Sequence, residues 1–396
     1  MYKEWRAYEM KQILSCLTLI AMLISVTPVA FAKESTTVEL ADKAKSAVLI
    51  ERDTGTILYD KNSEEKLPPA SMTKIMTMLL IMEALEKNQI KMDEMVRTSE
   101  YAASMGGSQI FLEPGEEMTV EQMLKGIAIG SGNDASVAMA EKIAGSNEEF
   151  VSMMNKKVKE LGLKNTHFKN PTGLPEPDHY SSAHDMAIMA KELLKYEEIT
   201  NFTGKYEAYL RENTDKKFWL VNTNRLVKFY PGVDGVKTGF TNEAKYCLTA
   251  TAKKGDMRVI AVVFGADTPK ERNSQVTKML DYAFSQFQTH PLFEKDHVLT
   301  QLKINKGKEK EANLITSESI SVLTKKGESV DDVTQEIVMK KDVQAPIKMG
   351  DELGSLRLMK DNKIIAESKL IAEKDIVEAS WWELFQRVTG QFTKSS

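Results

Sequence analysis

The sequence predicts a multidomain protein that mixes α and β structure: an antiparallel sheet flanked by helices, a small all-β domain and an amphipathic C-terminal helix. Its 396 residues are too many for one ordinary domain. Two β-rich hairpins enclose a long helix-rich stretch, and near residue 290 the chain changes to short alternating segments. The predicted divisions are a signal peptide at 1–32, a catalytic domain at 33–290, an all-β accessory domain at 291–373 and an amphipathic helix at 374–396.

The first 32 residues have the pattern of a secretory signal peptide. Lys3, Arg6 and Lys11 precede an uncharged run over 13–26, and Ala-Phe-Ala closes the segment at Ala32. Residues 13–32 are also about long enough to span a bilayer, so an uncleaved anchor is the alternative. The small-x-small ending favours cleavage and therefore export.

Composition excludes several classes of protein. The bulk of the chain has the hydrophobic and charged fractions of a soluble globular protein, and its net charge of -4 gives no basic excess for nucleic-acid binding. Cys16 lies in the predicted signal peptide, so Cys247 has no partner for an internal disulfide. An exported protein without disulfides fits a bacterial cell surface. Cys247 lies among apolar residues of a predicted strand, which predicts a buried, unreactive thiol.

Regular elements follow from the spacing of apolar residues. Two hairpins, over 46–60 and 246–264, turn at Gly55 and Gly255 and are predicted to share one antiparallel sheet. Helical spacing is found in six segments: 71–87, 120–127, 134–143, 148–161, 183–194 and 272–287. In the first of these, Ile75, Met78 and Met82 form an apolar stripe. A site is expected where the sheet meets these helices.

The tail over 376–392 has bulky apolar residues at helical spacing, including Trp381, Leu384 and Phe385. Such a face favours the membrane interface, and it predicts attachment to a membrane surface. The alternative is a helix that packs onto its own β-domain. The basic flank usual for membrane-surface helices is thin here, with only Arg387 and Lys394.

Ser-x-x-Lys is the pattern most suggestive of chemistry, and it occurs twice, at Ser71 with Lys74 and at Ser63 with Lys66. A serine three residues before a lysine at a helix start places hydroxyl and amine on one face. The amine can then take the proton of the hydroxyl. Ser71 opens a helical run, whereas Ser63 lies among acidic residues at a strand exit. We therefore predict Ser71 as the nucleophile and Lys74 as its base.

Two further motifs accompany Ser71. Ser131-Gly132-Asn133 and Lys237-Thr238-Gly239 each occur once, and either alone is a plausible chance match. In the order Ser-x-x-Lys, Ser-x-Asn, Lys-Thr-Gly they match the signature of penicillin-binding proteins and serine β-lactamases.

Beyond these motifs, roughly residues 40–290 resemble the low-molecular-mass D-alanyl-D-alanine carboxypeptidases. The segments that carry the resemblance are 106–108, 133–135, 170–174, 182–186 and 232–241. The resemblance implies a penicillin-binding-protein/β-lactamase-like catalytic domain that removes the terminal D-alanine from peptidoglycan pentapeptides through an acyl-enzyme, with penicillin as a covalent inhibitor. Within the family the chain is similar to the sporulation-associated enzymes of Gram-positive spore formers. The family resemblance also implies a location at the outer face of the cytoplasmic membrane or in the cell wall.

The resemblance also implies roles for individual residues. Ser131 would relay a proton to the leaving amine, and Asn133 would hold the substrate amide or Lys74. The terminal carboxylate would be bound by Lys237 and Thr238. Further substrate contacts would come from Gly239, which leaves room along the strand edge, from the backbone N–H of Phe240 in an oxyanion hole with that of Ser71, and from Arg225 beside the carboxylate. No metal or other cofactor is implied.

Three other functions are less consistent with the sequence. A Ser-His-Asp hydrolase would need a Gly-x-Ser-x-Gly elbow, which is missing. A class A β-lactamase needs a deacylating glutamate, and neither Glu160 nor Glu176 lies in that loop pattern. A non-catalytic wall-binding or β-lactam-binding protein predicts a broken motif set, whereas all three motifs here are intact.

Overall fold

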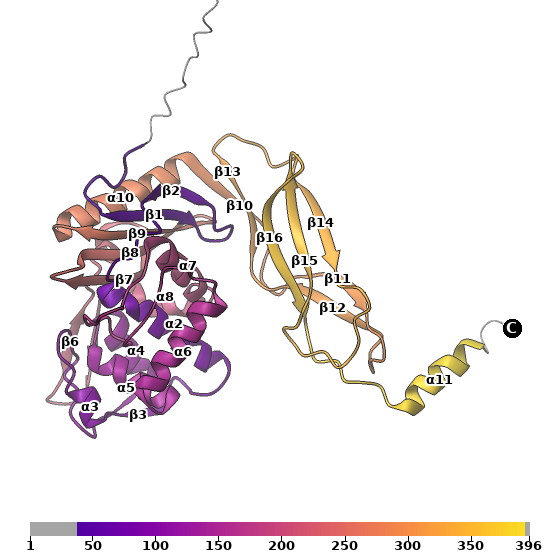
Figure 1. The fold of residues 1–396 in the computed structure, drawn as a ribbon, viewed down its shortest axis with the longest axis horizontal. Helices are drawn as coiled ribbons and strands as arrows, with labels where there is room; N and C mark the ends of the chain where they lie inside the picture. Colours follow the sequence, from indigo (N-terminus) through magenta and orange to yellow (C-terminus); the bar gives the residue numbers. More distant parts are fainter. Residues whose placement is uncertain (1–37, 393–396) are drawn as a thin grey trace, which may run out of the picture. The chain divides into compact units, whose positions relative to one another are not determined.

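A computed structural model describes residues 38–392 (Figure 1). The predicted signal peptide at 1–32 lies outside the described residues. The two predicted hairpins do share one antiparallel sheet, of order β2-β1-β9-β8-β7. Its strands are β1 (Ser46–Glu51), β2 (Ile57–Lys61), β7 (Val233–Thr241), β8 (Lys245–Lys254) and β9 (Met257–Ala266). β7 carries the Lys-Thr-Gly motif and pairs on one side with β8, so it forms an edge of the sheet.

Both faces of this sheet are buried. On β1, Val48 and Ile50 belong to the core shared with the central helices. Ala47 and Leu49 belong to a second core, which the helix over residues 269–286 covers. Successive side chains of a strand point to opposite faces, so the apolar run of β1 supplies both cores. Figure 1 shows α10 (Pro269–Gln286) on one side of the sheet and the helices between residues 74 and 193 on the other.

The helices of this domain include one close to each of the six segments that apolar spacing predicts, together with shorter helices that it does not predict. They are η1 (Ala70–Thr73), α2 (Lys74–Glu86), α3 (Glu100–Ala103), α4 (Val120–Ala128), α5 (Asn133–Ala144), α6 (Asn147–Glu160), α7 (Ala183–Leu193), η2 (Glu197–Ile199), α8 (Thr200–Thr203), α9 (Leu226–Phe229) and α10 (Pro269–Gln286). Two small two-stranded sheets lie between the helices in the sequence. One pairs β3 (Met95–Arg97) with β4 (Glu117–Thr119), and the other pairs β5 (Glu207–Leu210) with β6 (Phe218–Val221).

Two details differ from the predictions. α10 begins three residues early, because Thr268 accepts a hydrogen bond from the Glu271 N–H and Pro269 occupies the first turn. The predicted one-sided stripe of α2 is wrong, because ten of its thirteen residues are buried. A helix surrounded by protein on all sides is apolar all round, and α2 is the central helix of its domain.

An all-β domain follows, as predicted. β10 (Phe287–Phe293) pairs with β13 (Ile320–Lys325), and a five-stranded antiparallel sheet has the order β11-β12-β16-β15-β14. Its strands are β11 (Val298–Lys303), β12 (Glu311–Thr316), β14 (Thr334–Met339), β15 (Glu352–Lys360) and β16 (Lys363–Ala372). This domain has a core of its own, which includes Leu314, Leu356 and Leu370.

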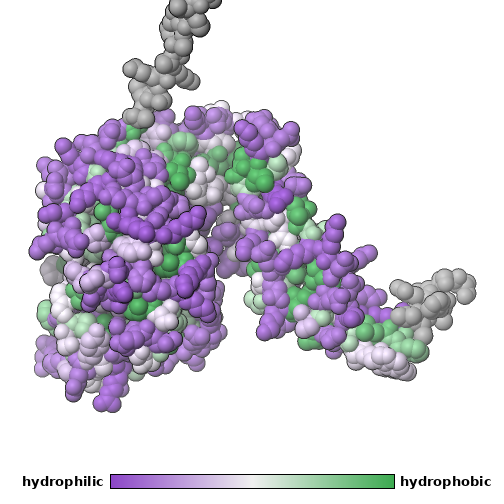
Figure 2. Space-filling view, in the orientation of Figure 1, coloured by the Kyte–Doolittle hydropathy of each residue, from purple (hydrophilic) through white to green (hydrophobic). Residues whose placement is uncertain are grey.

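The C-terminal helix α11 (Trp381–Phe392) is present but starts later than the predicted residue 376. Ile376 forms a β-bridge with Ile347, and Ser380 accepts a hydrogen bond from the Glu383 N–H at the helix start. Trp381 is 73% exposed and Trp382 57% exposed. Apolar and pale side chains gather at this helix in Figure 2. Within residues 38–392, none of the helices combines the length and apolarity needed to cross a bilayer.

Candidate active site

Ser71 lies in the tight turn η1 that leads into α2. Ala70, just before it, has a φ of 48°, a left-handed conformation that is strained for alanine. Two glycines make room for this turn. A Cβ on Gly239 of β7 would lie 2.7 Å from the Pro69 carbonyl oxygen, and a Cβ on Gly173 would overlap the Ala70 carbonyl. The turn is therefore held between β7 and the segment around Gly173.

This packing predicts an unusual cost for Gly173→Ala. Gly145 has the same φ of 83° but open space around it, so Gly145→Ala serves as a control. The left-handed conformation alone costs alanine about 1–2 kcal/mol. We expect Gly173→Ala to cost about 1–3 kcal/mol more, as overpacking does, and also to slow penicillin labelling. Thermal unfolding and labelling rates check this; equal effects of the two substitutions would contradict it.

Lys74 is fully buried and surrounded by oxygen atoms. Its Nζ lies 3.0 Å from Ser71 Oγ, 2.7 Å from Asn133 Oδ1 and 2.6 Å from the Thr172 carbonyl oxygen. Burial, and secondly the positive charge of Lys237, hold the pKa of Lys74 well below its usual value, while Asp134 opposes the shift. A neutral amine has two N–H groups and one lone pair. In this neutral form, with Asn133 and Thr172 accepting its two N–H groups, the amine would direct its lone pair at Ser71 Oγ.

The Ser-x-Asn motif lies at the start of α5. Ser131 is buried, with a φ of 62°. Among the described residues its hydroxyl has no hydrogen-bond partner, which leaves it available to a bound molecule. Asn133 is the first residue of α5, and it accepts from Lys74 and donates to the Gly106 carbonyl over 2.6 Å. Asn133 therefore holds Lys74, one of its two predicted roles.

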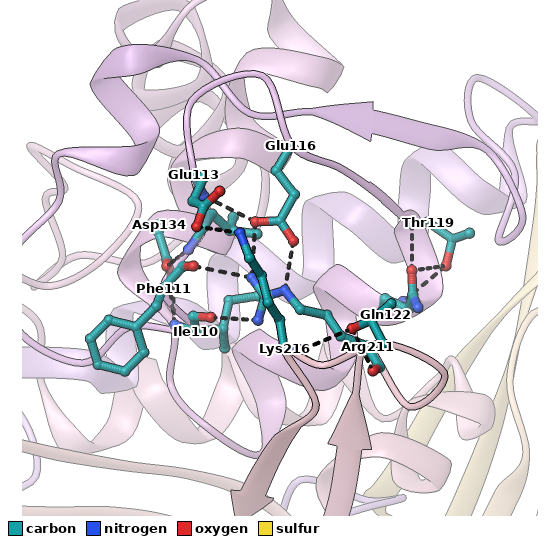
Figure 3. Close-up of polar contacts among 11 residues, drawn as sticks. Ile110, Phe111, Glu113, Glu116, Thr119, Gln122, Asp134, Arg211 and Lys216 are labelled. Atoms are coloured by element: carbon teal, nitrogen blue, oxygen red, sulfur yellow. Dashed lines mark hydrogen bonds and ion pairs between the residues drawn. The ribbon is translucent and has the colours of Figure 1, made fainter.

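The loop before α4 is fastened to this motif (Figure 3). The carboxylate of Asp134 accepts from the backbone N–H groups of Ile110 and Leu112. The Arg211 guanidinium donates to the Ile110 and Phe111 carbonyls over 3.1 Å each and also pairs with Glu116. The residue after Asn133 thus ties this loop to the start of α5.

The Lys-Thr-Gly motif is part of the edge strand β7. Lys237 is fully buried, and burial first, then the charge of Arg272, lower its pKa to about 7. Thr238 Oγ1 donates to Thr223 Oγ1 over 2.7 Å. Phe240 is half exposed and its ring lies against that of Tyr246. Backbone groups on the free side of an edge strand remain available to a peptide.

A cavity of about 560 Å³ opens beside the turn that carries Ser71. Pro69 and Ala70 form one wall, and Leu174, Tyr180 and Thr241 contribute to the others. A cavity of this size is ample for part of a peptide.

Comparison with known proteins decides the family. Residues 32–268 match the model of the family described as D-alanyl-D-alanine carboxypeptidase, and residues 287–378 match that of the penicillin-binding protein 5 C-terminal domain. The chain belongs to the D-alanyl-D-alanine carboxypeptidase family. It is a serine-type D-alanyl-D-alanine carboxypeptidase, as the sequence predicted, with the β-domain typical of penicillin-binding protein 5.

Relatives match over nearly the whole chain. The D-alanyl-D-alanine carboxypeptidase DacF of Bacillus subtilis is 69% identical over 387 residues, which cover 97% of this chain and all of that protein. Penicillin-binding protein 5 of Haemophilus influenzae is 32% identical, with a TM-score of 0.66 over 85% of this chain and 98% of its own. Penicillin-binding protein D2 of Listeria monocytogenes in its ampicillin-bound form is 29% identical, with a TM-score of 0.55 over 61% of this chain and 98% of its own.

The structure of this carboxypeptidase brings most of the predicted residues together. Ser71, Lys74 and Asn133 are linked by hydrogen bonds, and Lys237 is close enough to influence Lys74. Arg225 is different: it is exposed, and its guanidinium donates to the Tyr206 hydroxyl over 2.6 Å. Thr223, two residues earlier, makes the contact with Thr238.

Sequence reasoning missed two contributors to the carboxypeptidase site. Arg272 of α10 is buried, and its side-chain hydrogen bonds within the described residues go to the neutral Asn273, so its positive charge acts on Lys237 without a carboxylate partner. The Thr172 carbonyl is the second contributor. The segment 170–174 carries part of the resemblance. Every residue has a backbone carbonyl, however, so the residue type at 172 does not reveal that its oxygen contacts Lys74. Cys247 is buried, which raises its pKa to about 12, as expected for an unreactive thiol.

Proposed function

We propose that Ser71 attacks the carbonyl between the two terminal D-alanines of a peptidoglycan stem pentapeptide. Lys74 takes the proton of the Ser71 hydroxyl as the new ester bond forms. The peptide bond then breaks, and Ser131 relays this proton from Lys74 to the departing amine of D-alanine, which leaves Lys74 neutral again. Water hydrolyses the ester and regenerates Ser71. The observation that carries this proposal is the position of Lys74 Nζ, which lies 3.0 Å from Ser71 Oγ and within hydrogen-bond distance of Asn133 Oδ1 and the Thr172 carbonyl oxygen.

Substrate binding is proposed to use the edge of β7. Lys237 and Thr238 would bind the terminal carboxylate, and the backbone N–H groups of Ser71 and Phe240 would stabilise the oxyanion. Thr238 would contact the carboxylate of the leaving D-alanine, and Phe240 the carbonyl that is attacked. The strand would therefore run from the leaving-group side to the acyl side, and Thr241 would lie on the acyl side of the scissile bond. The cavity lined by Thr241 and Ala70 is therefore proposed to take the part of the peptide that stays on the enzyme. The unpaired charge of Arg272 behind Lys237 would strengthen the attraction for the carboxylate.

β-Lactams are proposed to inhibit the protein by acylating Ser71. Penicillin-binding protein D2 of Listeria monocytogenes has been crystallised in ampicillin-bound and cefotaxime-bound forms, which supports the same chemistry in this chain. A β-lactamase on the same scaffold would hydrolyse the ester rapidly. A carboxypeptidase that the drug inhibits is instead expected to release it slowly.

One experiment tests the function directly. The purified protein is incubated with a pentapeptide that ends in D-Ala-D-Ala, and free D-alanine and the tetrapeptide product are measured together. Equal amounts of both are expected, and fluorescent penicillin should label the protein and persist after excess drug is removed. Absence of D-alanine release, or loss of label within the time of mixing, would contradict the proposal.

Attachment to a membrane surface through α11 remains a proposal, as do export and a role in sporulation. The exposed Trp381, Trp382 and Phe385 support attachment, because bulky aromatic side chains favour the membrane interface. The prediction is that deleting 381–396 releases the protein from sedimenting liposomes while leaving D-alanine release intact. Residues 376–380 are kept, because Ile376 is paired with Ile347. Sedimentation of the truncated protein with liposomes would show that another segment anchors it.

A further inference from the structure

The turn over 170–174 presents its Thr172 carbonyl oxygen to the buried amine of Lys74, 2.6 Å away. This contact occupies one of the two N–H groups that a neutral lysine can donate. If the carbonyl moved away, the amine could rotate, and its lone pair would no longer be fixed on Ser71 Oγ. The position of one backbone oxygen therefore affects how well Lys74 accepts a proton.

Asn170 holds this turn in place with all of its side-chain amide. Its Oδ1 accepts from the Thr172 N–H at 3.2 Å, the Thr172 hydroxyl at 2.9 Å and the Gly173 N–H at 2.7 Å. Its Nδ2 donates to the Leu174 carbonyl at 3.0 Å. Four hydrogen bonds thus join the Asn170 side chain to residues 172, 173 and 174, on both sides of the peptide group that contains the Thr172 carbonyl.

The same turn is also fastened to α2, the helix that starts with Lys74. Thr77 Oγ1 donates to the Pro171 carbonyl over 2.7 Å. His179 Nε2 lies 2.8 Å from Thr73 Oγ1, and burial lowers the pKa of His179 to about 4, so the ring is neutral. The Thr77 bond ties the turn to α2, and the His179 bond ties the chain beyond the turn to η1, but neither reaches Thr172. Of Thr77, His179 and Asn170, only Asn170 bonds to Thr172 itself.

We infer that Asn170 is a positioning residue for the acylation step: it sets the direction of the Thr172 carbonyl, which in turn directs the lone pair of Lys74 at Ser71. The side-chain hydrogen bonds of Asn170 go to residues 172–174 and not to Ser71 or Lys74, so Asn170 acts through the turn. The inference rests on the proposed role of Lys74 as base. It adds a requirement for the turn at 170–174 that the three catalytic motifs do not contain.

The test compares three variants of the full chain. Asn170→Ala removes all four bonds, and Asn170→Asp keeps the accepting oxygen. Asn155→Ala is the matched control, because Asn155 also makes hydrogen bonds to this loop, to the N–H and carbonyl of Phe168, without reaching 170–174. The rate constant of acylation by fluorescent penicillin is measured across pH, and thermal unfolding is measured in parallel.

Misplacement of a catalytic group by about 1 Å can cost about 10²-fold in rate, and we expect Asn170→Ala to lose about that much at its plateau. Its acidic limb should move to lower pH, because charged Lys74 loses an acceptor. Asn170→Asp should recover most of the rate, and Asn155→Ala should match the wild type even if its unfolding temperature falls. Equal losses in the two alanine variants, or no loss in Asn170→Ala, would overturn the inference.

These results separate this inference from the proposed function. If Ser71→Ala still takes up penicillin, the proposed nucleophile is wrong, whatever Asn170 does. If labelling requires Ser71 while Asn170→Ala acylates at the wild-type rate, only the positioning role of Asn170 is lost.

Discussion

Ser71→Ala is expected to abolish both penicillin labelling and D-alanine release. Without Oγ no ester can form, and removal of a catalytic serine costs on the order of 10⁶-fold in a serine hydrolase. The fold should persist, because the substitution removes one oxygen from a half-buried turn. Labelling after denaturing electrophoresis and D-alanine release from the pentapeptide measure the loss.

The duplicated motif supplies the control for this experiment. Ser63 is buried and its hydroxyl donates to Asp60, while the Lys66 amine lies 4.8 Å above the centre of the Tyr180 ring. Serine and lysine of this copy thus have separate partners, and the Lys66 amine does not face the Ser63 hydroxyl. Ser63→Ala should label and release D-alanine as the wild type does. Label retained in Ser71→Ala and lost in Ser63→Ala would reverse the assignment.

The choice between the two copies shows what sequence reasoning could reach. Ser71 was preferred because it opens a helical run and is followed by two further motifs in the right order. Those arguments concern residue types and local spacing. They also predicted Lys74, Asn133 and Lys237, whose side chains do the bonding. Contacts made by backbone atoms, such as the Thr172 carbonyl, depend on the path of the chain and have no signature of this kind.

Tertiary packing explains the other differences. The strand β7 was not placed by alternation, because its sequence is rich in glycine and its edge position leaves it with little apolar content. Arg272 lies 35 positions after Lys237 in the chain numbering, and only the packing of α10 against the sheet brings its charge to bear on Lys237. Arg225 shows the reverse: resemblance to a family arginine suggested a site residue, yet its side chain donates to Tyr206.

Lys74→Met is expected to lower the rate of acylation by about 10²–10⁴-fold, the usual contribution of a general base. Methionine fills a similar volume without the amine, so packing around α2 is retained. The non-covalent affinity for the pentapeptide should change little, because the proposed carboxylate contacts are on β7. Rapid-mixing measurements with penicillin separate binding from acylation. A variant that acylates at the wild-type rate would exclude Lys74 as the base.

The pH dependence follows from the same two lysines. Lys74 acts in its neutral form, so acylation should fall as pH decreases through its pKa, which burial and Lys237 hold well below the usual value. Lys237 is proposed to bind the carboxylate in its charged form, so activity should also fall above its own pKa, which is about 7 before a carboxylate binds and should be higher afterwards. A bell-shaped profile is therefore expected.

Lys237→Met separates the two limbs of this profile. Removing the neighbouring positive charge favours protonated Lys74 and raises its pKa, so the acidic limb of penicillin acylation should move to higher pH. The basic limb should disappear with the ammonium that caused it, while the overall rate falls because the carboxylate is bound less well. An acidic limb that stays in place would mean that burial alone, without Lys237, keeps Lys74 neutral.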